Sequence, residues 1–150
     1  MSKATKIARA EFGSVSCGTL RPEDLIPAFA DVLESLDANG AYAALVREAG
    51  ESMDIDAQDS ILDDLRDALE SFAPPYGYFG TLEGDGADFG FWPSHDAVQD
   101  AIHDKTAIKV DDMGDVPKGY TGDVFHVSDH GNLTYYVAKR GKCREVWGIV

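Results

Sequence analysis

The chain is short of basic residues, of cysteines and of long apolar runs, and each scarcity excludes a class of function. Its 150 residues include 13 Lys and Arg against 27 Asp and Glu, a formal net charge of −14 at pH 7. Such a surface repels nucleic acids and anionic membranes, because phosphate groups are bound by lysine and arginine side chains. We therefore expect no direct nucleic-acid partner and no membrane partner. A basic protein is the kind of partner that this charge favours.

The two cysteines, Cys17 and Cys143, are too few for a disulfide framework. The first ten residues lack the apolar core of a signal peptide. No apolar segment approaches the roughly 20 residues that cross a bilayer. These absences predict a cytoplasmic protein with reduced thiols.

The negative charge is unevenly distributed along the chain. Residues 10–104 contain 21 acidic and three basic residues, whereas 139-KRGKCR-144 alone contains four bases. A chain of this length fits one domain with an adequate core. We predict a flexible basic arm over residues 1–10 and a single domain over residues 11–150, with a basic patch close to its C-terminus.

Hydrophobic periodicity predicts three helices in the first half of the chain. The first begins near Pro22 and ends at 37-DANG-40. The second places Tyr42, Leu45 and Val46 inward and stops at Gly50. The third is 54-DIDAQDSILDDLRDALESF-72, after which two prolines forbid continuation.

Strand patterns flank these helices. Residues 11–20 alternate as a first strand, and aromatic runs on both sides of 83-EGDGAD-88 predict a β-hairpin. Ser94 is expected to cap a short helix. Three further strands are predicted at 123-DVFHVS-128, 133-LTYYVA-138 and 143-CREVWGIV-150. The order predicts an α+β fold: N-terminal helices packed on a mainly antiparallel sheet with a C-terminal three-stranded meander.

The carboxylates of the third helix gather on the side opposite its apolar face. Five of them lie on that side, and Asp64 is added as a further candidate for partner binding; we call the set the acidic stripe: Asp56, Asp59, Asp63, Asp64, Asp67 and Glu70. The ordinary interpretation is the solvated face of an amphipathic helix. However, no lysine is interspersed, and like charges four residues apart, such as Asp59 and Asp63, cost a few tenths of a kcal/mol per pair. A sequence that retains such self-repulsion favours a partner-binding surface.

The spacing of the acidic stripe limits any imitation of a nucleic acid. The five carboxylates of the stripe other than Asp64 span about 21 Å of helix axis, from Asp56 to Glu70, or one charge per roughly 5 Å. One strand of a DNA duplex has a charge every ~3.4 Å. Carboxylates of neighbouring helices would have to join the stripe for a DNA mimic.

An alternative site is centred on His126, Asp129 and His130, where the first and second strands of the meander meet. A zinc site requires four ligands, or three and a water, so His95, His103 or a distant carboxylate would have to complete it. The competing interpretation, which we favour, is a turn held by its own hydrogen bonds, with no metal and no cofactor. An enzyme or ligand-binding domain would use this site beside an aromatic pocket, for which the candidate lining is Tyr78, Phe91, Trp92, Tyr135 and Trp147. The competing interpretation of most of these aromatic residues is that they belong to the core. We find no catalytic signature in the sequence and favour a protein that is not an enzyme.

Several stretches resemble small acidic proteins of phages, prophages and plasmids. They are 11-EFGSVSCGTLRPEDLIPAF-29, 88-DFGFWPS-94, 129-DHGNLTYY-136 and 145-EVWGIV-150. The resemblance implies a place in the cytoplasm of a bacterial host cell and a role as an inhibitor of host defence, of the anti-restriction or anti-CRISPR kind. Some such proteins occupy a nucleic-acid-binding surface. No functional residue transfers, because the resemblance includes no motif of known role.

Two hypotheses about partners follow. The first is that the acidic stripe binds and blocks a basic, nucleic-acid-handling host protein. The second is a homo-oligomer, in which an exposed edge strand at residues 143–150 pairs between chains or the basic patch of one copy meets the acidic helix of another.

Overall fold

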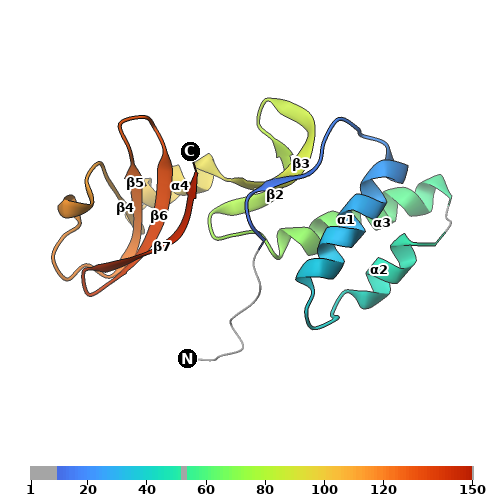
Figure 1. Cartoon of the computed structure of the whole chain (residues 1–150), viewed down its shortest axis with the longest axis horizontal. Helices are drawn as coiled ribbons and strands as arrows, with labels where there is room; N and C mark the ends of the chain where they lie inside the picture. The colour runs from blue at the N-terminus through green and yellow to red at the C-terminus, as the bar shows by residue number, and fades with distance from the viewer. Residues whose placement is uncertain (1–9, 52–53, 150) are drawn as a thin grey trace. The chain divides into compact units, whose positions relative to one another are not determined.

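A computed structural model describes residues 10–51 and 54–149 of the chain. The chain forms two compact units, unit 1 up to Ser94 and unit 2 from His95 onward (Figure 1). Both units combine helices and strands, which confirms the predicted α+β class. The sequence suggested one domain over residues 11–150; the structure divides that range between Ser94 and His95. Of the predicted arm, the structure describes Ala10, which is buried and donates its backbone N–H to the Phe72 carbonyl.

Unit 1 contains a three-stranded antiparallel sheet. It is formed by β1 (Gly13–Ser16), β2 (Gly77–Leu82) and β3 (Asp85–Pro93) in the order β1-β3-β2. The predicted aromatic hairpin is confirmed as β2 and β3. Gly84 makes its turn with φ +87°, a conformation that glycine adopts without strain.

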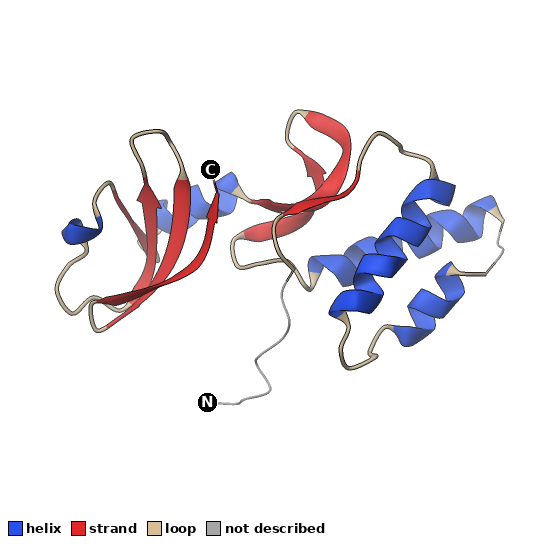
Figure 2. Ribbon diagram, viewed as in Figure 1, coloured by secondary structure: helices blue, strands red, loops and turns tan. Residues whose placement is uncertain are grey.

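Three helices pack together in unit 1 (Figure 2). They are α1 (Pro22–Leu36), α2 (Ala43–Ala49) and α3 (Ile55–Glu70), and all three were predicted from the hydrophobic period. Asp54 caps α3, since its carboxylate accepts a hydrogen bond from the Ala57 N–H at 2.8 Å.

The core of unit 1 lies where α1 and α3 meet the sheet. The most deeply buried side chains come from all three elements: Leu25, Phe29, Leu33, Leu65, Leu69 and Phe91. The Phe29 ring of α1 lies edge-on to Phe79 and to Phe89, with ring centroids 5.1 and 5.3 Å apart. These contacts pack α1 against β2 and β3.

Unit 2 is a short helix followed by a four-stranded sheet. The elements are α4 (His95–His103), β4 (Ala107–Val110), β5 (Gly122–Val127), β6 (Leu133–Lys139) and β7 (Lys142–Ile149). The strand order is β4-β5-β6-β7. The predicted meander is confirmed as β5, β6 and β7, which run antiparallel. Strand β4 was not predicted, and it pairs parallel to β5.

The basic patch lies at the turn between β6 and β7, where all of its bases are exposed: Lys139, Arg140, Lys142 and Arg144. Arg140 and Gly141 make this turn with φ 54° and 82°, which fits a two-residue hairpin connection. Among the described residues, no helix has the length and apolar character required to cross a membrane.

Candidate partner-binding surface

The acidic stripe lies on the solvent-facing side of α3. The opposite side of the helix buries Ile61, Leu65, Ala68 and Leu69 in the core of unit 1. Because side chains of one helix face recur every three to four residues, this burial turns the carboxylates outward, and all six residues of the stripe are exposed. The structure therefore places these residues together on one surface, as the sequence predicted.

No base forms an ion pair with the stripe within the part of the chain that the structure describes. Arg66 is the only base on α3, and its guanidinium lies 5.6 Å from the centre of the Phe89 ring, in a cation–π contact. The ion pair that is present elsewhere joins Arg21 to Glu23. There, the hydrogen bond and charge of Arg21 lower the pKa of Glu23, and Glu23 raises the pKa of Arg21.

The two units differ strongly in charge. Residues 1–94 carry 18 acidic and 6 basic residues, a net charge of −12, whereas residues 95–150 carry 9 and 7, a net charge of −2. The acidic stripe thus belongs to the unit that holds most of the negative charge. A net charge of this size and sign gives unit 1 a negative electrostatic potential.

Glu70 differs from the rest of the stripe because it also holds the fold together. Its Oε2 accepts a hydrogen bond from the Phe79 backbone N–H at 2.8 Å, which ties the C-terminal end of α3 to β2. A carboxylate at a helix C-terminus is otherwise unfavourable, since the carbonyl end of the helix is negative. This bond explains a carboxylate at that position without any partner.

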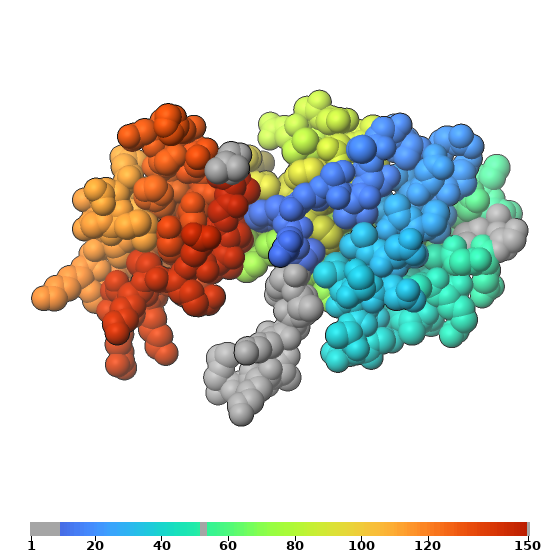
Figure 3. Space-filling view, viewed as in Figure 1, coloured from blue at the N-terminus to red at the C-terminus, as the bar shows by residue number. Residues whose placement is uncertain are grey.

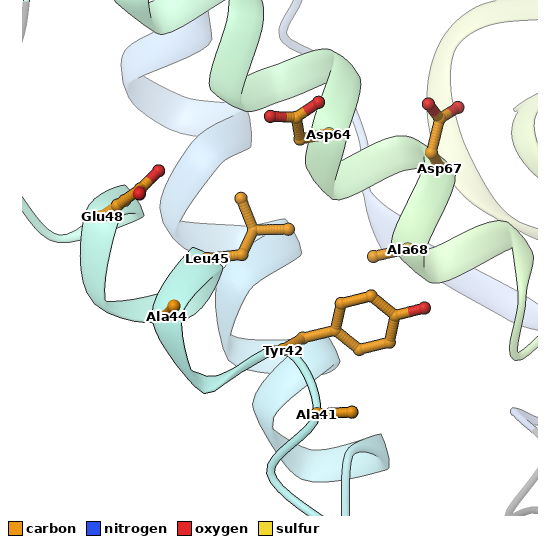
Figure 4. Close-up of a pocket in the computed structure, with 8 residues that line it drawn as sticks. All are labelled: Ala41, Tyr42, Ala44, Leu45, Glu48, Asp64, Asp67 and Ala68. Carbon is orange, nitrogen blue, oxygen red and sulfur yellow. The ribbon is translucent and has the colours of Figure 1, made fainter.

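Surface hollows border α3 on two sides. One, of about 470 Å³, lies between α2 and α3 (Figure 4). The other, of about 440 Å³, is lined by Asp63, Arg66, Asp67, Glu70 and Phe79. Asp67 lines both. The acidic surface is therefore concave on both sides of α3, so binding there would depend on shape complementarity as well as on charge.

The hollow between α2 and α3 was not predicted. The sequence placed Tyr42, Leu45 and Val46 inward, and the structure leaves all three half-buried. No residue of α2 is fully buried, and α2 forms part of the visible surface of unit 1 in Figure 3. The sequence signal was present in the shortness of α2, because seven residues offer too small an apolar face to cover a neighbouring helix.

The histidine-centred alternative receives no support from the geometry. His126 lies on β5, and its Nε2 is 3.1 Å from the Asp111 carbonyl oxygen. His130 is exposed in the turn that follows β5, so the two rings do not share a strand face. Hydrogen bonds across Ser128 and Asn132 close that turn. Within residues 10–51 and 54–149, no three His, Cys, Asp or Glu side chains are placed to hold a metal ion.

The aromatic residues proposed for a pocket divide between the two units and make structural contacts in each. In unit 1, Phe91 is buried, Tyr78 donates its hydroxyl to the Thr81 carbonyl, and Trp92 donates Nε1–H to the Gly80 carbonyl. In unit 2, Tyr135 and Trp147 pack with Phe125, and the Tyr135 hydroxyl donates to Asp123 Oδ1 at 2.7 Å. Burial, with Glu83 nearby, raises the pKa of Tyr78 above that of an ordinary phenol.

Comparison of the chain with protein-family models, with curated proteins and with solved structures found no match.

Proposed function

We propose that this chain is a non-enzymatic binding protein whose acidic stripe engages a basic, nucleic-acid-handling protein and blocks it. One observation carries the proposal: six exposed carboxylates lie on one helix, with no ion pair to any of them among the described residues. A helix gains stability from bases interspersed among its acids at i, i+3 or i, i+4 spacing. Arg66 is the base on α3, and its guanidinium lies over the Phe89 ring and forms no ion pair with the stripe.

Electrostatic attraction gives this surface a specific mode of action. The summed field of unit 1 steers a basic partner toward it and raises the association rate, and salt weakens the effect. Blockade then follows from steric occupation of the partner's basic groove. Charge alone does not specify the partner, so the two hollows beside α3 contribute the shape on which selectivity depends.

Complete imitation of DNA is not required for this mechanism. Apart from Asp64, the carboxylates of the stripe are spaced by about 5 Å of helix axis, wider than the phosphates of one strand at ~3.4 Å. Glu48 adds a carboxylate from α2 across the first hollow. We propose, from the resemblance to proteins of mobile elements, that the partner belongs to a bacterial host and that the function is inhibition of host defence, of the anti-CRISPR or anti-restriction kind.

The test is capture of partners from a nuclease-treated bacterial lysate on the immobilised protein, with elution by stepped salt and identification by mass spectrometry. We expect a nucleic-acid-handling protein that elutes at moderate salt. The variant with Asp59→Lys, Asp63→Lys and Asp67→Lys should lose it while its circular dichroism spectrum is unchanged.

The matched control changes the same charge in the other unit. Asp96→Lys, Asp100→Lys and Asp104→Lys alter the net charge by the same amount on exposed positions at and after α4. This control should retain the partner. Equal retention by both variants would contradict the surface that we propose, and equal loss would indicate non-specific charge attraction.

A further inference from the structure

The hollow between α2 and α3 has an apolar floor and an acidic rim. Figure 4 shows the Tyr42 ring and the Leu45 side chain reaching from α2 toward α3. The full lining is Ala41, Tyr42, Ala44, Leu45, Glu48, Asp64, Asp67 and Ala68. A surface that combines half-buried apolar side chains with carboxylates that form no ion pair among the described residues fits a ligand of the opposite pattern: an apolar anchor flanked by cations.

The walls of the hollow are held in place before any ligand arrives. The Asp37 carboxylate accepts hydrogen bonds from the backbone N–H groups of Ala41 and Tyr42 at 3.0 and 2.7 Å, which fixes the start of α2. The Tyr42 ring lies edge-on to Phe72 with centroids 6.0 Å apart. A preformed hollow loses little conformational entropy on binding.

We infer that this hollow is the docking groove for a basic amphipathic segment of the partner protein. The segment would place an aliphatic side chain against Tyr42 and Leu45 and direct lysine or arginine heads to Glu48, Asp64 and Asp67. The inference rests on the proposed function and deepens it. It assigns the selectivity for a partner to the hollow between α2 and α3, and not to the whole row of carboxylates along α3.

Charge complementarity decides the chemistry of the occupant. Three carboxylates around one rim reject phosphates and acidic peptides, and a neutral apolar ligand would leave them without a counter-charge. Lysine and arginine fit both parts of the surface, since their aliphatic stems cover apolar groups while their heads stay among charges and water. A volume of about 470 Å³ accommodates side chains of a docked segment.

The experiment is a titration of the ¹⁵N-labelled full chain, followed by amide chemical shifts. The first probe is a synthetic helical peptide with two leucines on one face and arginines beside them. The second is the same peptide with serines in place of the leucines. We expect the leucine peptide to bind about tenfold more tightly or better, the effect of burying one leucine side chain, with the largest shifts at Tyr42, Leu45 and Ala68.

Two groove variants test the placement. Leu45→Gln removes the apolar wall, and Ala44→Gln partly fills the hollow from an exposed helix position where glutamine is well tolerated. Both should abolish the preference for the leucine peptide. The pair Asp56→Asn and Asp59→Asn, at the other end of α3, should keep it.

The outcomes separate the groove from the proposed function. Equal binding of the two peptides, with shifts along the stripe, would overturn the groove and leave the proposed function standing. No binding of either peptide would contradict both. Concentration-dependent shifts at the same amides without peptide would assign the groove to a second copy of this chain, and would also overturn the inference.

Discussion

Neutralising the centre of the acidic stripe should make the protein more stable and less able to bind. Asp63 is the residue of choice, because it lies four residues from Asp59 and four from Asp67 on α3. The substitution Asp63→Gln removes both like-charge pairs and keeps a polar side chain on the exposed face.

The magnitude follows from the helix geometry. Each like-charge pair at i, i+4 costs about 0.2–0.5 kcal/mol, so relief of two pairs gives about 0.4–1 kcal/mol. An attraction between Asp63 and Arg66 would offset part of this gain. The offset is small, since no ion pair forms between them and the Arg66 guanidinium lies over the Phe89 ring. Glutamine also has the higher helix propensity, which adds a few tenths of a kcal/mol.

The assay is urea unfolding followed by far-ultraviolet circular dichroism, at low salt and in about 1 M NaCl, where the Debye length is about 3 Å. We expect the variant to be more stable at low salt and the charge-dependent part of the gain to shrink at high salt. A loss of stability at low salt would refute the reasoning, because it would mean that the Asp63 carboxylate makes a stabilising contact. A gain in stability together with weaker binding would show that the stripe lowers the stability of the fold and serves binding.

Three further substitutions test the structural roles. Glu70→Ala should lower the free energy of unfolding, measured in the same urea assay, by about 1.5 kcal/mol, the value of a hydrogen bond to a charged group. The loss arises because the Phe79 N–H loses its acceptor. Glu70→Gln keeps an acceptor and should lower the free energy of unfolding by less. Gly90→Ala should cost about 1–3 kcal/mol through overpacking, since its Cβ would lie 2.2 Å from the Gly13 carbonyl oxygen; a neutral result would contradict the close crossing of β1 and β3. Burial raises the folded-state pKa of Tyr78 above its ordinary value of about 10. Its contribution to stability is therefore complete below pH ~10 and lost as pH rises through the folded pKa. Tyr78→Phe should flatten that alkaline decline in urea titrations, and an unchanged profile would contradict the assignment.

The elements with strong periodicity were predictable from the sequence. α3 was recovered with its end, because the apolar face and the two prolines that follow indicate the same helix. The hairpin of β2 and β3 and the meander of β5 to β7 followed from glycine-containing turns between apolar runs. In each case local chemistry and long-range packing favour the same structure.

Features that depend on contacts distant in sequence were missed. β4 is only 107-AIKV-110 and has no distinctive alternation, so its pairing to β5 decides that it is a strand. The division into two units between Ser94 and His95 was not predicted, because no glycine- or proline-rich linker marks it in the sequence. The groove depends on where α2 sits, and the Asp37 carboxylate that positions it gives no periodic signal.

The central claim is that electrostatics on the acidic stripe drives recognition, and the most direct test is the salt dependence of binding to the captured partner. Affinity and association rate are measured for the wild type and for the variant with Asp59→Asn, Asp63→Asn and Asp67→Asn, from low to high ionic strength. We expect the wild-type association rate to fall steeply with salt, and the variant to bind weakly with a shallow dependence. Equal affinities with equal salt slopes would contradict the claim and leave the stripe as a solvated helix face.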